Sequence, residues 1–185
     1  PITSVTNGVH VPTWIASELN HLYLKYLGID WSARHDDPLL WQRIEDIPSE
    51  ELWDVHMVLK FKLMRFLRAK ARRSWIGGQS DPTQVMTSGT MLDPEALTIG
   101  FARRAAPYKR ADLLFSNIQK LIEITKEHGR IQIVYAGKAH PKDPNGKELI
   151  KRIFTASKDL EGKIDIVYLP NYNMDLGKLL TSGVD

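Results

Sequence analysis

The stretch Leu97-Thr-Ile-Gly-Phe-Ala102, followed directly by Arg103-Arg-Ala-Ala-Pro-Tyr-Lys-Arg110, decides the fold of this 185-residue chain. A short apolar run of this kind is expected of a strand buried on both faces. Two similar runs follow, Ile131-Gln-Ile-Val-Tyr-Ala136 and Ile164-Asp-Ile-Val-Tyr-Leu169. Helical spacing separates them, so the sequence predicts an α/β fold with a parallel sheet and right-handed crossovers. Helices are expected through Leu113, Leu114, Ile118, Leu121 and Ile122 to His128-Gly129, through Leu149 to Phe154, and over 174–180.

The part of the chain before these strands is predicted to be helical. Pro12 can open a helix that ends at Gly28, Asp36-Asp37-Pro38 opens a short one, and Pro48-Ser49 starts a long one. We therefore expect an N-terminal turn and helical segment over 1–76, a turn-rich linker over 77–94, and an incomplete sheet domain over 95–185.

Composition narrows the classes of function. Six His and no Cys exclude a disulfide framework and a thiolate metal site, and suit a reducing cytoplasm. No run approaches the roughly 20 apolar residues of a membrane helix, and no signal peptide is visible. The net charge of +3 permits an anionic ligand without demanding nucleic acid. Since the chain begins at Pro1 rather than Met, we expect it to be a piece of a longer protein.

The loop at 103–110 carries four cations and no acid, between a strand end and an expected helix start. A helix N-terminus attracts anions, and arginine forks match phosphate oxygens. The pattern therefore predicts a phosphate site at the carboxyl end of the sheet, where such folds bind ligands. The alternatives are a solvated basic loop, or arginines that are paired with acids elsewhere.

The loop at 137–146 resembles a P-loop only superficially. Gln132 stands where the first glycine belongs, and Ala139 replaces the Ser/Thr that would hold magnesium. We expect Gly137 to allow close backbone approach at the strand end. Lys138 is weak support for a ligand site by itself, and His140 beside Pro141 is expected to be a loop residue rather than a base.

The loop at 170–173 contains Tyr172, which can stack on a ring, donate a hydrogen bond or serve a structural role. Asp175 is expected to cap the last helix. Near the N-terminus, Thr6-Asn7-Gly8 forms a polar turn that leads to Trp14, and Asn7 suits a hydroxyl group. Glu18 with His21 is too little for a metal site.

The second half of the long helix is basic. One interpretation is that it forms a nucleic-acid-binding surface. The other is an ordinary solvated helix whose acids at its start and cations at its end match the helix dipole. The cations are Lys60, Lys62, Arg65, Arg68, Lys70, Arg72 and Arg73.

Four motifs occur in a familiar order: Thr6-Asn7-Gly8 with Trp14, Arg103-Arg104 with Tyr108-Lys109-Arg110, Gly137-Lys138-Ala139, and Leu169-Pro-Asn-Tyr172. Together they make nearly the whole chain resemble the α-glucan (glycogen, starch and maltodextrin) phosphorylases, and most closely their shorter bacterial and archaeal branch. The resemblance implies part of a two-domain GT-B glycosyltransferase fold with a Rossmann-like sheet. It also implies pyridoxal 5′-phosphate (PLP) and release of α-glucose 1-phosphate from α-1,4-glucan by inorganic phosphate.

The resemblance also implies roles for single residues. Arg104 looks like the arginine that grips substrate phosphate, and Lys109 like the lysine between the substrate and PLP phosphates. Arg103 falls where many relatives have a lysine facing the PLP phosphate. Tyr108 and Asn7 would lie near glucose hydroxyls, and Trp14 and Tyr172 beside PLP.

The chain departs from the family pattern in several places. Ala106-Pro107 replaces a His-Glu pair of longer relatives, and Arg103 lacks lysine's geometry. The family's PLP lysine would lie beyond Asp185, and its glycine-rich loop before Pro1, so the chain alone is expected to be inactive. Rival readings are a glycogen-synthase-type nucleotide-sugar transferase, a nucleic-acid module and a silent carbohydrate-binding relative. An oligomer is possible, and neither a metal nor a membrane is expected.

Overall fold

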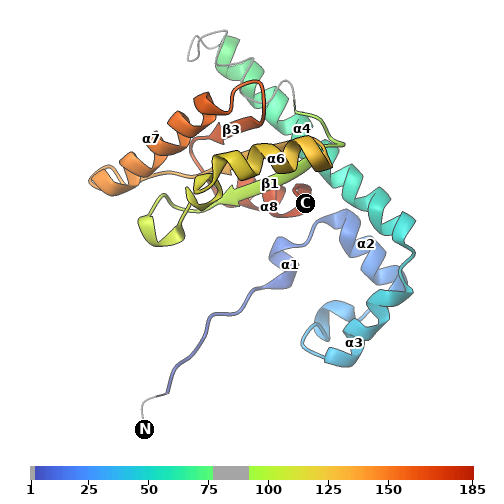
Figure 1. The fold of residues 1–185 in the computed structure, drawn as a ribbon. Helices are drawn as coiled ribbons and strands as arrows, with labels where there is room; N and C mark the ends of the chain where they lie inside the picture. The colour runs from blue at the N-terminus through green and yellow to red at the C-terminus, as the bar shows by residue number, and fades with distance from the viewer. Residues whose placement is uncertain (1–2, 77–91) are drawn as a thin grey trace. The chain divides into compact units, whose positions relative to one another are not determined.

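The computed structural model describes residues 3–76 and 92–185. These residues form two compact units, Pro1–Leu59 and Lys60–Asp185, and each is described here by itself. The predicted linker over 77–94 falls largely outside the described residues. The last part of helix α4 (Ser49–Ile76) belongs to the second unit, together with the sheet (Figure 1).

The sheet of the second unit has three parallel strands, β1 (Leu97–Ala102), β2 (Ile131–Ala136) and β3 (Asp165–Leu169), in the order β1-β2-β3. The first two predicted strands are confirmed at both ends, and the third begins one residue later than expected. The six residues of β1 pair in order with the six residues of β2, so that Gly100 lies opposite Val134. All six residues of β2 are buried, because β2 has a strand on each side and helices on both faces.

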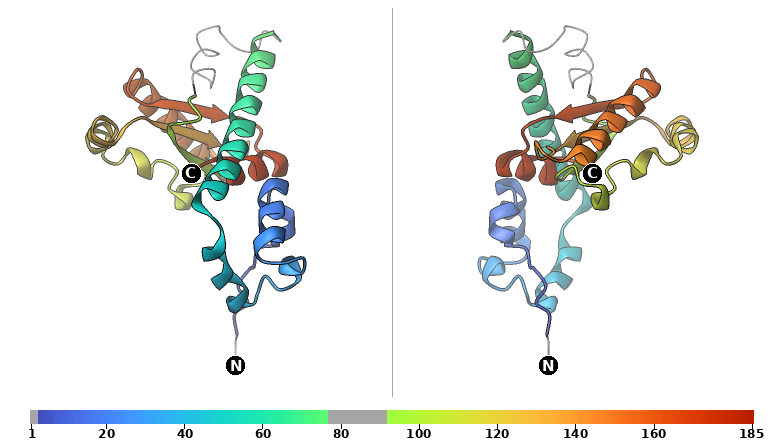
Figure 2. Two further views of the ribbon diagram at one scale, coloured as in Figure 1. Left: turned by 90° about the vertical axis from the view of Figure 1, so that its right-hand side faces the viewer. Right: turned by 90° about the vertical axis from the view of Figure 1, so that its left-hand side faces the viewer.

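Helices cover both faces of this sheet, as Figures 1 and 2 show. Ile133 and Tyr135 pack in one core cluster with residues of α6 (Ile118–His128) and α7 (Pro144–Asp159). Val134 and Ala136 pack in another with residues of α4 and α8 (Met174–Gly183). The alternation follows from the period of two in a strand. The predicted α/β class is therefore confirmed.

The starts of the helices differ from the sequence prediction at two points. The helix expected from Leu113 begins only at Ile118, with the Asn117 side chain accepting from the Lys120 amide at 2.9 Å. Before it lies only a 3₁₀ turn, Leu113–Phe115. The cap of α8 is Asn173, which accepts from the Leu176 amide at 2.9 Å, so the prediction of Asp175 as the cap was wrong. Asp175 lies in the first turn instead.

After β3 the chain returns across the sheet to β1. Helix α8 lies on the face opposite α6 and α7, and at its end the Asp185 amide donates to Thr98 O at 3.0 Å. The Asp185 carboxylate accepts from the Thr98 amide at 2.7 Å. Thus α6 and α7 carry the chain from β1 towards β3, and α8 reverses that direction. In doubly wound sheets such a reversal marks the place where ligands bind, at the carboxyl ends of the strands.

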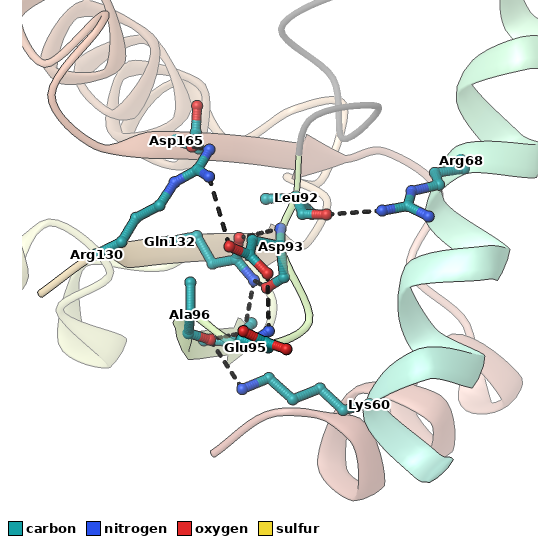
Figure 3. Close-up of polar contacts among 10 residues, drawn as sticks. Lys60, Arg68, Leu92, Asp93, Glu95, Ala96, Arg130, Gln132 and Asp165 are labelled. Carbon is teal, nitrogen blue, oxygen red and sulfur yellow. Dashed lines mark hydrogen bonds and ion pairs between the residues drawn. The ribbon is translucent and has the colours of Figure 1, made fainter. Parts of the chain in front are cut away.

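A buried polar network joins the amino ends of the strands to α4 (Figure 3). Gln132, fully buried, donates to Asp93 O at 2.7 Å and to Thr98 Oγ1 at 2.8 Å, and accepts from the Asp93 amide at 2.9 Å. From α4, Lys60 donates to Ala96 O at 2.8 Å and Arg68 donates to Leu92 O at 2.9 Å.

These contacts correct the interpretation of the basic helix as uniformly solvated. Lys60 is only 2% exposed and forms an ion pair with Asp185 at 2.6 Å. Two cations of the basic run, Lys60 and Arg68, therefore hold the helix to the segment that enters β1. Lys60 is thereby buried, whereas Arg68 stays exposed although it donates to Leu92 O.

The first unit is a small helical cluster. It contains α1 (Val11–Trp14), α2 (Ser17–Tyr26), α3 (Pro38–Gln42) and the start of α4, with 3₁₀ turns at Trp31–Ala33 and Arg43–Asp46. Its core is formed by Leu27, Trp31 and Leu40. The helix predicted from Pro12 to Gly28 is interrupted, because Ile15 and Ala16 adopt extended backbone. The sequence carries no Gly or Pro there to signal the break.

The other helix signals of this unit are confirmed. The Asp37 carboxylate caps α3 by accepting from the Leu39 amide at 2.9 Å. Gly28 follows α2 with a φ of 107°, the left-handed conformation that suits glycine after a helix. No helix in the described part of the chain is long and apolar enough to cross a membrane.

Candidate anion-binding site

The cationic loop, residues Arg103–Arg110, leaves the carboxyl end of β1 as predicted, but its local structure differs from the prediction. Pro107–Lys109 forms a 3₁₀ turn that ends at Arg110, whose φ of 52° is left-handed and stops any helix there. Because α6 begins only at Ile118, the loop does not enter an α-helix. The helix N-terminus invoked for anion binding is therefore absent from this loop, and the cations must act without it.

The first half of the loop is held against the loop that follows β2. The Arg103 amide donates to Ala136 O at 3.2 Å, and the Ala105 amide donates to Lys138 O at 3.1 Å. These bonds continue the β1–β2 pairing beyond the ends of the two strands. The Ala105 side chain is buried in the core cluster beneath. The loop is thus fixed on either side of Arg104.

The segment directly after the loop, residues 111–112, is held from the sheet and from α7. The buried Tyr135 hydroxyl on β2 donates to Ala111 O at 2.8 Å. Burial, with the nearby Asp112 carboxylate, raises the pKa of Tyr135, so its proton stays available for this bond. Asp112 forms an ion pair with Arg152 of α7 at 2.9 Å.

The charged side chains at the start of the loop are exposed and unpaired. Within residues 3–76 and 92–185, neither Arg103 nor Arg104 forms an ion pair or side-chain hydrogen bond, and both are exposed. Lys109 forms no ion pair with any described residue, and its Nζ lies 4.6 Å from the centre of the Tyr108 ring. Of the two alternatives to a ligand site, pairing with acids is therefore excluded for the described residues. Solvated cations held on a fixed backbone remain, and these suit a phosphate.

A hollow of about 500 Å³ adjoins the loop on the α6 side of β1. Lys109 and Arg110 lie at it, and its walls are largely apolar, including Phe101, Leu114 and Leu121. Sequence reasoning missed this hollow, because its lining comes from β1, β2 and α6, which are separate segments of the sequence. Neither Arg103 nor Arg104 lines it.

The neighbouring loop after β2 behaves as expected. A Cβ added to Gly137 would lie 2.7 Å from Arg103 O, so the prediction of close backbone approach is confirmed. His140 Nδ1 accepts from the Lys142 amide at 3.1 Å, which fits a loop residue. Lys138 is exposed.

The remaining candidate residues belong to other segments than the cationic loop. Tyr172 follows β3, which β2 separates from β1, and its ring packs against the α4–α8 core cluster. Asn7, which is exposed, and Trp14, which is half-buried, belong to the first unit. The structure thus brings Arg103, Arg104, Tyr108 and Lys109 together on one loop beside Gly137 and Lys138. No group of three or more potential metal ligands occurs in the described part of the chain.

Comparison with known proteins gives a consistent set of relatives. No family model matches the chain. Along its whole length it is 45% identical to a glycogen phosphorylase of Aquifex aeolicus, 37% to a glycogen phosphorylase of Mycobacterium tuberculosis and 35% to a maltodextrin phosphorylase of Thermococcus litoralis. The chain spans 27%, 21% and 22% of the lengths of these relatives. The matched stretch includes the cationic loop and both neighbouring loops.

Proposed function

We propose a function from one premise: this chain belongs to the family of glycogen and maltodextrin phosphorylases, which it matches from end to end. On that premise, it forms part of an α-glucan phosphorylase of GT-B fold that acts in the cytoplasm. The whole enzyme uses inorganic phosphate to release α-glucose 1-phosphate from the ends of α-1,4-glucans. Because the chain spans about a quarter of its relatives' length, we expect it to be inactive by itself.

The observation that carries the proposal is a set of three cations, exposed Arg103 and Arg104 and half-buried Lys109, which have no carboxylate partner among the described residues. A phosphate dianion needs several positive groups at close range, and arginine meets two of its oxygens at once. Cations already engaged by carboxylates would have to break those pairs first. Arg103, Arg104 and Lys109 form no ion pair with a described carboxylate, so a phosphate could bind them without breaking one.

The roles of the side chains follow from the family resemblance. Arg104 binds the substrate phosphate, and Lys109 lies between that phosphate and the phosphate of PLP. Arg103 faces the cofactor, Tyr108 and Asn7 contact glucose hydroxyls, and Trp14 and Tyr172 lie beside PLP. The cations offset the repulsion between two phosphates in a cleft from which water is excluded, where charges interact strongly.

The donor set of this chain fits the phosphate group of PLP. Two arginines and a lysine without carboxylate partners are what a second bound phosphate requires. When bound, PLP supplies through its phosphate a group that exchanges a proton with the substrate phosphate. Arg103 and Lys109 would hold that phosphate, and Arg104 would orient the substrate phosphate beside it.

The experiment that tests the proposal compares Arg104→Ala with Arg72→Ala in the full-length protein. Arg72 is an exposed arginine of α4, so its variant controls for loss of charge. Removing a charge-assisted hydrogen bond costs about 1.5–3 kcal/mol, so Arg104→Ala should raise KM for phosphate roughly ten- to hundredfold. KM for the glucan should change little, and Arg72→Ala should leave both constants as they are.

The outcomes separate the proposal from its nearest rival. An unchanged KM for phosphate in the Arg104 variant contradicts the assignment. Glucosyl transfer from ADP-glucose or UDP-glucose, without phosphate-dependent release of glucose 1-phosphate, would instead identify a nucleotide-sugar transferase. A nucleic-acid role is disfavoured because Lys60 and Arg68 bond within the fold.

A further inference from the structure

We propose that Gly146, together with Gly137, is a positioning residue that sets where Arg104 lies. This inference rests on the proposed function and adds to it residues that touch neither phosphate nor glucan. At these two positions the space around the glycine matters, not its backbone conformation. Neither glycine has a left-handed φ, unlike Gly28, Gly129 and Gly162. The absence of a side chain, not an unusual dihedral angle, is therefore what these two positions use.

Gly146 is buried in the first turn of α7, where it meets the cationic loop. A Cβ at this position would lie 2.4 Å from Ala105 O, 2.9 Å from Asp143 Oδ2 and 3.1 Å from the Ala139 Cβ, so the Ala105 backbone is its closest neighbour. Glycine inside a helix costs about 0.5–1 kcal/mol relative to alanine, so the helix itself would be better served by alanine. The close approach of the Ala105 carbonyl explains why this position has no side chain.

Gly137 makes the same kind of approach one residue beyond β2. Its added Cβ would lie 2.7 Å from Arg103 O, and real Cβ atoms essentially never come closer than 3.0 Å to another heavy atom. The two carbonyls involved, Arg103 O and Ala105 O, belong to the residues on either side of Arg104. Both glycines therefore fix the backbone that carries the proposed phosphate-binding side chain.

The loop cannot easily move aside to admit a methyl group. The Arg103 and Ala105 amides are bonded to carbonyls of the 136–138 segment, and the Ala105 side chain is buried below them. Asp143, which caps α7 by accepting from the Gly146 amide at 3.0 Å, fixes the opposing side. To widen the distance between a Cβ at position 146 and Ala105 O from 2.4 to 3.0 Å, the loop must shift by about 0.6 Å. To widen the distance between a Cβ at position 137 and Arg103 O from 2.7 to 3.0 Å, it must shift by about 0.3 Å.

Displacements of this size matter at a reacting centre. A misplacement of about 1 Å can cost on the order of a hundredfold in rate or affinity. We therefore expect a graded effect, in which Gly146→Ala raises KM for phosphate about tenfold or more and Gly137→Ala raises it about threefold. A merely structural role would instead lower thermal stability, or change the constants for both substrates together.

The test uses the full-length protein and compares Gly146→Ala with Asn145→Ala. Asn145 is exposed in the same turn of α7, so its variant matches the change in helix composition without touching the loop. Initial rates give KM for phosphate and for glucan separately, and circular dichroism with thermal unfolding checks the fold. We expect a higher phosphate KM in Gly146→Ala, a glucan KM within twofold, and wild-type constants in Asn145→Ala.

Four results would overturn the inference. A wild-type phosphate KM in folded Gly146→Ala, or equal increases for phosphate and glucan, removes the positioning role. If Gly146→Ala does not fold, Gly137→Ala decides, and an unchanged phosphate KM there has the same meaning. If the unmodified protein releases no glucose 1-phosphate, the proposed function fails and the inference falls with it.

Discussion

Replacing Gln132 with Met should destabilise the sheet unit by about 3 kcal/mol, because Gln132 satisfies three polar groups where no water reaches. Its side chain is fully buried and makes three hydrogen bonds of 2.7–2.9 Å with Asp93 and Thr98. Methionine has a similar length, so the substitution removes the bonds without opening a large cavity. Each lost bond contributes about 1 kcal/mol. The Asp93 amide loses its Gln132 partner, whereas the Asp93 carbonyl keeps the hydrogen bond from the Ala96 amide at 3.2 Å.

Hydrogen exchange of the β2 amides is the appropriate assay, since it reports the stability of the sheet directly. A loss of about 3 kcal/mol corresponds to exchange roughly a hundredfold faster in the most protected amides. Gln119→Met, on the exposed side of α6, is the matched control and should change the stability by less than about 0.5 kcal/mol. A loss below about 1 kcal/mol in Gln132→Met would refute the reasoning, since it would mean that these groups find other partners.

Two further predictions concern ion pairs. Lys60→Met should cost the sheet unit about 3 kcal/mol, measured by the same exchange assay, because it removes a 2% exposed ammonium that pairs with the Asp185 carboxylate and donates to Ala96 O; a loss under about 1 kcal/mol would contradict it. In the helical unit, hydrogen bonds from Lys25 and Tyr26 lower the pKa of Glu51 below its ordinary 4.5. The stabilisation of the folded helical unit by ionised Glu51 is therefore present above pH 4.5 and is lost as the pH falls through the lowered pKa. An NMR titration of Glu51 with a midpoint at or above 4.5 would argue against it.

The strands were predictable because their signal is local. Three short apolar runs, each 5 or 6 residues long in the structure, are separated by amphipathic helices, and a strand buried on both faces needs no partner information to be recognised. The concentration of cations directly after β1 was visible for the same reason. Gly137 was also predictable, because a glycine at a strand end next to a ligand loop commonly permits close approach.

The errors arose where distant contacts decide the local structure. Lys60 belongs to the basic run of α4, and lysine is normally a surface residue, yet it bonds to Ala96 and Asp185 from far along the chain. The Pro107 turn was compatible with a helix start, and only the left-handed conformation of Arg110 ends it. Gly146 gave no signal, because its requirement depends on contact with Ala105.

The absence of an α-helix after the cationic loop changes how an anion must be bound there. In a P-loop or a helix N-terminus, backbone amides supply part of the attraction. Here the amides of Arg103, Ala105, Lys109 and Arg110 already donate to carbonyls of the protein. The side chains must therefore supply more of the positive charge than at a helix N-terminus, which fits four cations within eight residues.

Because the side chains rather than the backbone amides supply the charge, the backbone around Arg104 needs close packing to position them. A long arginine side chain places its guanidinium reproducibly only if its Cα is fixed, and the loop has no helix of its own to fix it. The contacts of Arg103 O with Gly137 and of Ala105 O with Gly146 supply that constraint without adding charge. Loss of Arg104 should therefore remove phosphate affinity that the backbone cannot replace, whereas loss of either glycine should misplace a charge that is still present. The two classes of variant then differ in salt dependence: added salt should further weaken phosphate binding in the glycine variants, which retain Arg104, more than in Arg104→Ala.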